Sequence, residues 1–261
     1  MSYKFLNIQR QGTIATLCLD RPACGNALSL ALMQEIIDAV VTFKYDTLTR
    51  VVIFRGNGKH FSVGADLKDP ARQEQQEDSD LLHRVHDTQL GRELIESILN
   101  INQITIAAVH GVAAGGATCI ASACDFRVGS DDCIIGYPEV KLGMNLSWGS
   151  LPLCYNLVGP AVAKRMVIGG ELEAATDLLH WGFLDELVSA SSLEQKSLEM
   201  AEFYASRPAM AAQMIKRGLN AIQLAASAGV MHADGDQFAL ASLSDDYRQA
   251  RAEFLAAREK K

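Results

Sequence analysis

The chain has 261 residues and a mass of 28.3 kDa, which is enough for one large domain with a well-filled core. Apolar residues make up 49% of it and charged residues 21%, a balance that excludes a chain disordered throughout. The formal net charge of −7 gives no basic excess for nucleic acid or an anionic membrane, so neither is expected as a partner.

The six cysteines form no CxxC pair and no zinc-type spacing with histidine, and most lie in apolar runs. No apolar stretch reaches the roughly 20 residues that a membrane-spanning helix needs. The N-terminus runs directly into strand-like sequence without a signal-peptide pattern. We therefore expect a complete, cytoplasmic chain with reduced thiols, no metal site and no membrane span.

The N-terminal segment has the pattern of β structure followed by a helix. Residues 3–9 and 12–19 alternate and then run apolar around Gln11-Gly12, which predicts a hairpin. After Ser29, a good N-cap, apolar residues recur at three- and four-residue spacing and predict a helix.

Further strands are expected deeper in the chain. The β-branched runs at 51–54 and 104–109 are each followed by a glycine turn and are separated by helical sequence. Between them, the acidic stretch 69–80 predicts an exposed loop, and the apolar spacing over 90–98 predicts a helix. Strands alternating with helices indicate an α/β core with parallel strands.

The C-terminal quarter has a different composition. From about residue 192 the strand patterns stop, and Ala, Leu, Met, Glu, Lys and Arg dominate. We therefore divide the chain into an α/β core over 1–190 and a helical region over 191–261.

Three stretches depart from what packing alone requires. Residues 60–67 (HFSVGADL) and 111–117 (GVAAGGA) place glycines directly after buried strands, and the second stretch opens a helix. Two backbone N–H groups aimed at one point from such turns would make an oxyanion hole. The third stretch, 136–143, puts the single carboxylate of Glu139 in an apolar, turn-rich setting, with Trp148 downstream.

Each pattern alone also has an ordinary structural explanation. A Gly-Gly pair after a strand commonly serves close helix–strand packing, and Glu139 without context is typical of a surface carboxylate. The glycine spacing GxxxGG does not match the dinucleotide fingerprint GxGxxG. The chain also has no GxSxG elbow and no HExxH motif, which leaves serine-hydrolase and zinc-protease functions without support.

Taken together and in this order, the stretches resemble the enoyl-CoA hydratase/isomerase (crotonase) superfamily over essentially the whole chain. Further matching segments are LDRP at 19–22, GNAL at 25–28 and FLAAR at 254–258, where Ala257 stands in place of a frequent lysine. The resemblance implies a repeated ββα spiral core followed by a helical trimerisation region, in a homotrimer or a dimer of trimers. It also implies an acyl-CoA substrate, with CoA entering as part of the thioester and no other cofactor.

The resemblance further implies roles for particular residues. Ala65 and Gly116 match the two backbone N–H donors that hold the thioester oxygen, and Glu139 matches the catalytic acid and base. Lys68 fits a CoA contact and equally fits a solvated surface lysine. The residues implied to bind substrate are Ala27, Ala65, Asp66, Leu67, Lys68, Gly115, Gly116, Cys119 and Trp148.

One departure from the family pattern bears on the reaction. Hydratases of the family use two glutamates, and here the first position is Cys119, which leaves only Glu139. Adding water needs both a base and an acid, and a buried thiol is a poor replacement for a carboxyl group. Moving a double bond from the 3,4 to the 2,3 position needs only one carboxylate and the oxyanion hole. The pattern resembles the single-glutamate Δ3,Δ2-enoyl-CoA isomerases, which is the activity we expect.

Alternative functions stay open at this point. A hydratase, or an enzyme for C–C hydrolysis or decarboxylation, could take a second acid from the 69–80 loop, His83 or His86. The ordinary structural explanation, which the pattern favours for those histidines, is a solvated helix face. A non-catalytic acyl-CoA-binding scaffold is the alternative outside enzymes.

Overall fold

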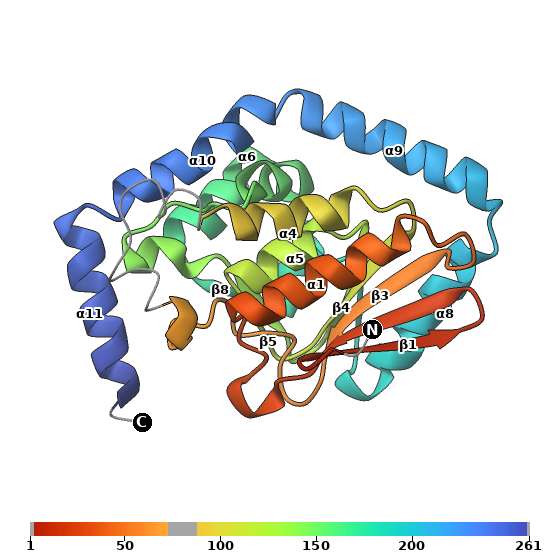
Figure 1. Cartoon of the computed structure of the whole chain (residues 1–261), viewed down its shortest axis with the longest axis horizontal. Helices are drawn as coiled ribbons and strands as arrows, with labels where there is room; N and C mark the ends of the chain where they lie inside the picture. Colours follow the sequence, from red (N-terminus) through yellow and green to blue (C-terminus); the bar gives the residue numbers. More distant parts are fainter. Residues whose placement is uncertain (1–2, 73–87, 260–261) are drawn as a thin grey trace.

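The computed structural model describes residues 3–72 and 88–259. Its centre is a six-stranded sheet in the order β1-β2-β3-β4-β6-β9, in which the first pair is antiparallel and the remaining pairs are parallel (Figure 1). The strands of this sheet are β1 (Leu6–Gln11), β2 (Ile14–Leu19), β3 (Val51–Gly56), β4 (Ile104–Val109), β6 (Phe126–Ser130) and β9 (Glu186–Val188).

A second, three-stranded sheet starts where β4 ends. Its order is β5 (Val112–Ala114), β7 (Ile134–Gly136) and β8 (Leu172–Ala174), with β5 parallel to β7 and β7 antiparallel to β8. Only two residues separate β4 from β5, so the chain passes from one sheet to the other within a single turn. This turn brings the segments after β3 and β4 together at the same edge.

Helices cover both faces of the large sheet and extend beyond it. The α-helices are α1 (Leu30–Phe43), α4 (Gln89–Leu99), α5 (Gly116–Ala123), α6 (Ser150–Gly169), α7 (Ala175–His180), α8 (Leu193–Ala205), α9 (Ala209–Ala225), α10 (Ala228–Ala241) and α11 (Asp245–Glu259). Short 3-10 helices are η1 (Pro22–Cys24), η2 (Pro138–Leu142) and η3 (Ala190–Ser192).

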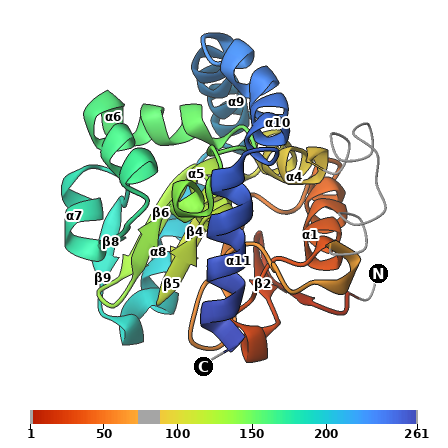
Figure 2. The same ribbon diagram turned by 90° about the vertical axis from the view of Figure 1, so that its left-hand side faces the viewer.

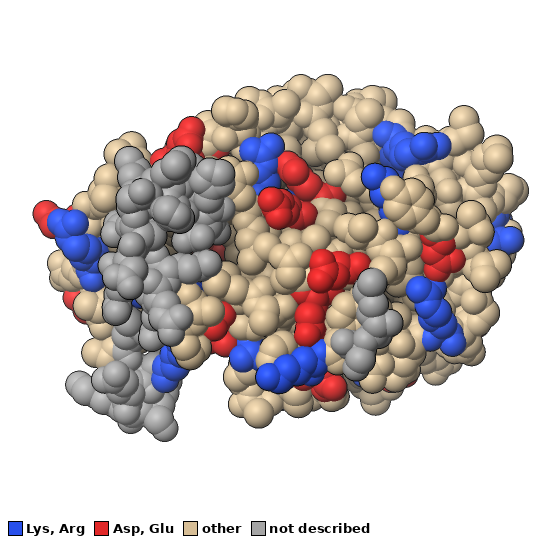
Figure 3. Space-filling view, viewed as in Figure 1, with Lys and Arg blue, Asp and Glu red and all other residues tan. Residues whose placement is uncertain are grey.

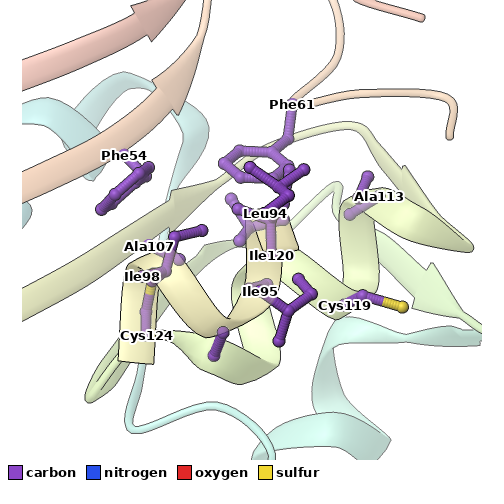
Figure 4. Packing of buried hydrophobic residues seen from close by; sticks show 14 of the residues in the cluster. Phe54, Phe61, Leu94, Ile95, Ile98, Ala107, Ala113, Cys119, Ile120 and Cys124 are labelled. Atoms are coloured by element: carbon purple, nitrogen blue, oxygen red, sulfur yellow. The ribbon is translucent and has the colours of Figure 1, made fainter. Parts of the chain in front are cut away.

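The buried core divides between the two faces of the sheet because side chains alternate along each strand. On β3, Val52 and Phe54 pack in the cluster under α1, α4 and α5, part of which is drawn in Figure 4. Val51 and Ile53 on the same strand belong to a separate cluster that includes residues of α8, such as Ala201. Both faces of the sheet are thus covered, as a parallel sheet requires.

The C-terminal helices wrap around this core. In Figure 1, α9 and α10 arch over α4, and α11 descends at the end of the molecule. The α9 helix is anchored by Lys216, whose buried Nζ lies 2.7 Å from Asp125 Oδ2 and donates a 2.7 Å hydrogen bond to the carbonyl of Gln103. Figure 2 shows α11 passing in front of α5. On the face in Figure 3, charges of both signs are interspersed with uncharged surface.

The expected fold class is confirmed, with some shifts in element boundaries. The expected helix at Ser29 is α1, and the Ser29 side chain accepts the Leu32 N–H at 3.2 Å. The first strand begins at Leu6 rather than residue 3, because the N–H groups of Lys4 and Phe5 donate to the Glu35 carboxylate at 2.9 and 2.8 Å.

The structure tests some of the other predictions from the sequence and leaves the rest untested. The strand expected over 51–54 continues to Gly56, and the helix expected over 90–98 is α4. Most of the acidic 69–80 loop, and both His83 and His86, lie outside the described residues. The boundary near residue 190 and the cytoplasmic location stay predictions. Among the helices within 3–72 and 88–259, none has both the length and the apolar character needed to cross a membrane.

Candidate active site

The first expected donor, Ala65, lies in the turn after β3. The flanking residues form a parallel bridge with Leu28, in which the Leu28 N–H donates to the Gly64 carbonyl at 2.8 Å and the Asp66 N–H donates to the Leu28 carbonyl at 3.0 Å. Because neighbouring residues use opposite sides of an extended backbone, the N–H of Ala65 points away from this bridge. No residue of the described chain accepts it.

The second expected donor, Gly116, is the first residue of α5. The N–H groups in the first turn of a helix have no intrahelical acceptor and carry the positive end of the helix dipole. Gly115, just before it, donates its own N–H to the Gly136 carbonyl at 2.9 Å. In the part of the chain that the structure describes, the Gly116 N–H has no such acceptor, so it is available to a ligand oxygen.

The two donor segments are fixed relative to each other. The Ser62 N–H donates to the Val112 carbonyl at 3.1 Å, and the Ala114 N–H donates back to the Ser62 carbonyl at 3.2 Å. The buried Ser62 hydroxyl donates to the Asn26 carbonyl at 2.8 Å. Hydrogen bonds made in advance hold both free N–H groups in place, which is how an oxyanion hole stabilises developing charge without reorganisation.

Glu139 lies in η2, which follows β7, and its carboxylate sits against Gly115. A Cβ on Gly115 would lie 2.9 Å from Glu139 Oε1, and Gly115 has a φ of +56°, so glycine is required there on both counts. The Oε2 atom is buried and has no hydrogen-bond partner among the described residues. Burial raises the pKa of the Glu139 carboxyl to about 7, against an ordinary value of 4.5. A carboxyl of this kind can both take up and release a proton near neutral pH.

Cys119 lies one turn into α5 and is buried. In Figure 4 its sulfur points away from the labelled core side chains. Burial, and then the nearby charge of Glu139, raise the pKa of the Cys119 thiol well above its ordinary value, while a hydrogen bond with the Ser150 side chain acts in the opposite direction. The thiol is therefore neutral at physiological pH and supplies neither a carboxylate nor a thiolate base.

A cavity of about 280 Å³ brings most of the expected site residues together. Its lining includes Ala65, Leu67, Gly116, Cys119, Glu139 and Trp148.

The other four expected residues lie beside this cavity and do not line it. Lys68 is exposed, and Asp66 forms a 3.0 Å ion pair with Arg21. The same guanidinium donates to the carbonyl of the buried Ala27. Gly115 lies behind the Glu139 carboxylate. Asp66 and Ala27 thus serve to tie the Arg21–Leu28 segment to the donor turn.

The structure adds cavity residues that sequence patterns did not indicate. Phe238 of α10 and Tyr247 and Arg251 of α11 line the cavity from the C-terminal region. The backbone of α11 approaches Gly143 closely, since a Cβ there would lie 2.7 Å from the Tyr247 Cα. Gly91, inside α4, also lines the cavity. An isolated glycine in a helical pattern was the one available signal for it, whereas the aromatic and basic residues of α11 look like ordinary helix positions.

Comparison with known proteins gives consistent matches over nearly the whole chain. A family model described as enoyl-CoA hydratase/isomerase matches residues 9–261. A probable enoyl-CoA hydratase of Rhizobium meliloti is 29% identical over 259 residues, 99% of this chain and 97% of that protein. The 2,3-dehydroadipyl-CoA hydratase of Escherichia coli is 28% identical over 97% of this chain and 96% of its own. An enoyl-CoA hydratase structure from Mycobacterium avium superposes with a TM-score of 0.86 at 23% identity, covering 98% of this chain and 97% of that one, which shows a shared fold.

Proposed function

The chain belongs to the enoyl-CoA hydratase/isomerase family, and we propose that within it the protein converts 3-enoyl-CoA into 2-enoyl-CoA thioesters. The observation that carries this proposal is the pairing of one carboxylate with one neutral thiol. Glu139 has a pKa of about 7, and the residue beside it in the cavity, Cys119, holds its proton. The site therefore has one proton-transferring group and two backbone donors.

The proposed reaction moves one proton between two carbons. The thioester oxygen accepts the N–H groups of Ala65 and Gly116, and the Glu139 carboxylate takes a proton from C2. The electron pair passes into the thioester, whose oxygen carries the charge of the dienolate while the donors stabilise it. The protonated Glu139 then returns the proton at C4, and the double bond lies between C2 and C3. The proposed reaction only moves a proton, so it requires no metal or redox cofactor. CoA enters as part of the substrate.

Hydration of 2-enoyl-CoA is the second candidate. The names of the relatives favour it, because those cited above are called hydratases. Water addition would need a group besides Glu139 to activate water or deliver a proton. In the described residues, the ionisable side chains other than Glu139 that line the cavity are Arg72, Cys119, Tyr247 and Arg251, none of which is a carboxyl group.

Initial rates on matched thioesters test the proposal. We expect 3-butenoyl-CoA to be isomerised faster than crotonyl-CoA is hydrated, with products identified by chromatography. Hydration that equals or exceeds isomerisation would overturn the proposal in favour of a hydratase. Binding of both thioesters without turnover would support an acyl-CoA-binding scaffold, and cleavage of a C–C bond in 3-oxoacyl thioesters would indicate the other reactions of the family.

We also propose that the protein assembles as a homotrimer or a dimer of trimers through its C-terminal helices. One face of α9 carries large apolar side chains that are 58–77% exposed, which is unfavourable in water and typical of an interface; they are Met210, Met214, Ile215, Leu219 and Ile222. The mass in solution tests this, by light scattering. Leu219→Lys should shift the mass toward the monomer, and Glu199→Lys, on the exposed surface of α8, should leave it unchanged.

A further inference from the structure

Trp148 has an unusual backbone conformation for a bulky residue. Its φ is +64°, and within the described chain only Asn26 shares this property among the non-glycine residues. The left-handed region is unfavourable for a large side chain, so the surrounding structure must impose it. Gly149, which follows with a φ of +68°, precedes the first turn of α6.

The indole of Trp148 lies between two glycines on different helices. A Cβ on Gly91 of α4 would lie 2.1 Å from the indole Nε1, and a Cβ on Gly116 of α5 would lie 2.4 Å from Cζ3. Any side chain at either position would therefore displace the ring. One end of the indole rests directly on the residue that carries the expected oxyanion donor.

Contacts from α10 hold the Trp148 segment in this position. The buried Asp234 carboxylate accepts the Gly149 N–H at 2.5 Å, and the Asp234 carbonyl accepts Asn145 Nδ2 at 3.2 Å. The side chain of Met231 fills the space next to Gly149, where a Cβ would lie 2.7 Å from its Cε. The strained loop is thus fixed on both sides of Trp148, and the ring acts as a rigid wall of the cavity.

We infer that Trp148 limits the size of the acyl group and restricts the enzyme to short acyl chains, of about four to six carbons. The thioester carbon must sit beside the Gly116 N–H, and the indole already occupies the space against that residue. The cavity of about 280 Å³ is small for a site that must hold the thioester as well as the acyl chain. Asp234 is a positioning residue for this wall. The inference rests on the proposed use of acyl-CoA thioesters.

A chain-length series with matched tryptophan variants tests the inference. The second tryptophan, Trp181, is the residue that follows α7, and the centroid of its ring lies 4.7 Å from the Arg165 guanidinium. It does not line the cavity, so Trp181→Leu is the control. The ratio of kcat/KM for the ten-carbon to the four-carbon thioester is measured on whichever of the 3-enoyl or 2-enoyl series wild type turns over. Trp148→Leu should raise this ratio at least tenfold and Trp181→Leu should leave it unchanged. A folded Trp148→Leu variant whose ratio stays within twofold of wild type would overturn the inference.

The positioning role of Asp234 has its own readout in the same series. Asp234→Asn keeps an oxygen that can accept the Gly149 N–H and should retain the short-chain preference. Asp234→Ala removes that acceptor and should raise the ten-carbon to four-carbon ratio. Equal ratios in both variants would overturn the positioning role.

If Trp148→Leu fails to fold, tryptophan fluorescence tests whether the Trp148 ring forms a wall of the acyl site. The Trp181→Leu protein contains Trp148 as its single tryptophan. Butanoyl-CoA, which has no double bond to move, should change its emission saturably, and CoA alone should not. Unchanged emission at concentrations where butanoyl-CoA inhibits turnover would overturn the wall assignment. Failure of the proposed function is a different result, namely no turnover of any enoyl thioester by the wild type.

Discussion

The two halves of the cavity are built in different ways. One half consists of backbone: the N–H groups of Ala65 and Gly116, held by short β-bridges between segments that follow neighbouring strands. The other half consists of side chains: Glu139, Cys119 and Trp148, which reach the cavity from η2, from α5 and from the loop before α6. The backbone half is fixed by the fold itself, whereas the side-chain half can change without altering the fold.

This difference indicates which part of the cavity determines the reaction and the substrate. Two backbone donors serve any reaction that passes through a thioester enolate, because they recognise only the charge on oxygen. In the proposed reaction, proton transfer and acyl selection depend on the three side chains. Variants in each half should therefore have distinguishable effects.

The largest expected effect is that of Glu139→Gln. The amide keeps the size of the side chain but cannot take up the C2 proton, so kcat should fall by about 10²–10⁴-fold. The backbone donors are untouched, so the affinity for butanoyl-CoA, measured by calorimetry, should change little. Turnover close to wild type would show that the base is another group.

Deleting a donor tests the backbone half. Ala65→Pro removes an N–H that the Leu28 bridge does not use, and kcat should fall by about 10²–10³-fold. Ala65→Ser keeps the N–H and is the control. Gly116 is less suited to this test because a Cβ there would meet the Trp148 ring at 2.4 Å. A folded Ala65→Pro protein with nearly full activity would contradict the donor assignment.

The raised pKa of Glu139 predicts a pH dependence in activity and in stability. The base must be ionised, so kcat/KM should rise with pH and level off above about pH 7. Because the carboxyl binds its proton more tightly in the folded chain, its stabilising effect is complete below pH 4.5 and is lost as the pH rises to about 7. That loss is about 3 kcal/mol in the free energy of unfolding. Denaturant unfolding of Glu139→Gln should lack this slope, and an identical slope in both proteins would contradict the shifted pKa.

The smallest expected effect is a gain of hydration activity rather than a loss of isomerisation. Cys119→Glu places a second carboxyl group near Glu139, and repulsion between the two should raise the pKa of one of them. A weak hydration of crotonyl-CoA should appear, measurable by the loss of its enoyl absorbance. The longer side chain in a buried position should cost about 1–3 kcal/mol of stability. Cys119→Gln, which has similar size without the acid, is the control; equal hydration by both variants would show that the second carboxyl does not matter.

The same division explains how much the sequence could predict. Glycine-containing turns after buried runs indicated the two donor segments from local signals, and the resemblance assigned Ala65 and Gly116 within them. Glu139 was indicated by the resemblance and by its apolar setting. The wall could not be predicted in the same way, because Trp148 is fixed by Gly91 and Asp234, which lie 57 and 86 residues away in sequence. Lys68 is exposed and does not line the cavity, and its expected contact with CoA stays a prediction.

The central claim is that one carboxylate carries out both proton transfers, and an isotope label tests it most directly. 3-Butenoyl-CoA carrying two deuterium atoms at C2 is incubated with the protein in ordinary water, and the crotonyl-CoA formed in the first turnovers is examined by mass spectrometry and NMR. Glu139 Oε2 is buried and has no partner among the described residues, so the transferred deuteron should exchange slowly with solvent. We expect deuterium at C4 of a measurable fraction of the product. Crotonyl-CoA with no deuterium at C4 even in the earliest product would contradict the account, because the proton at C4 would then come from solvent and not from C2 of the substrate.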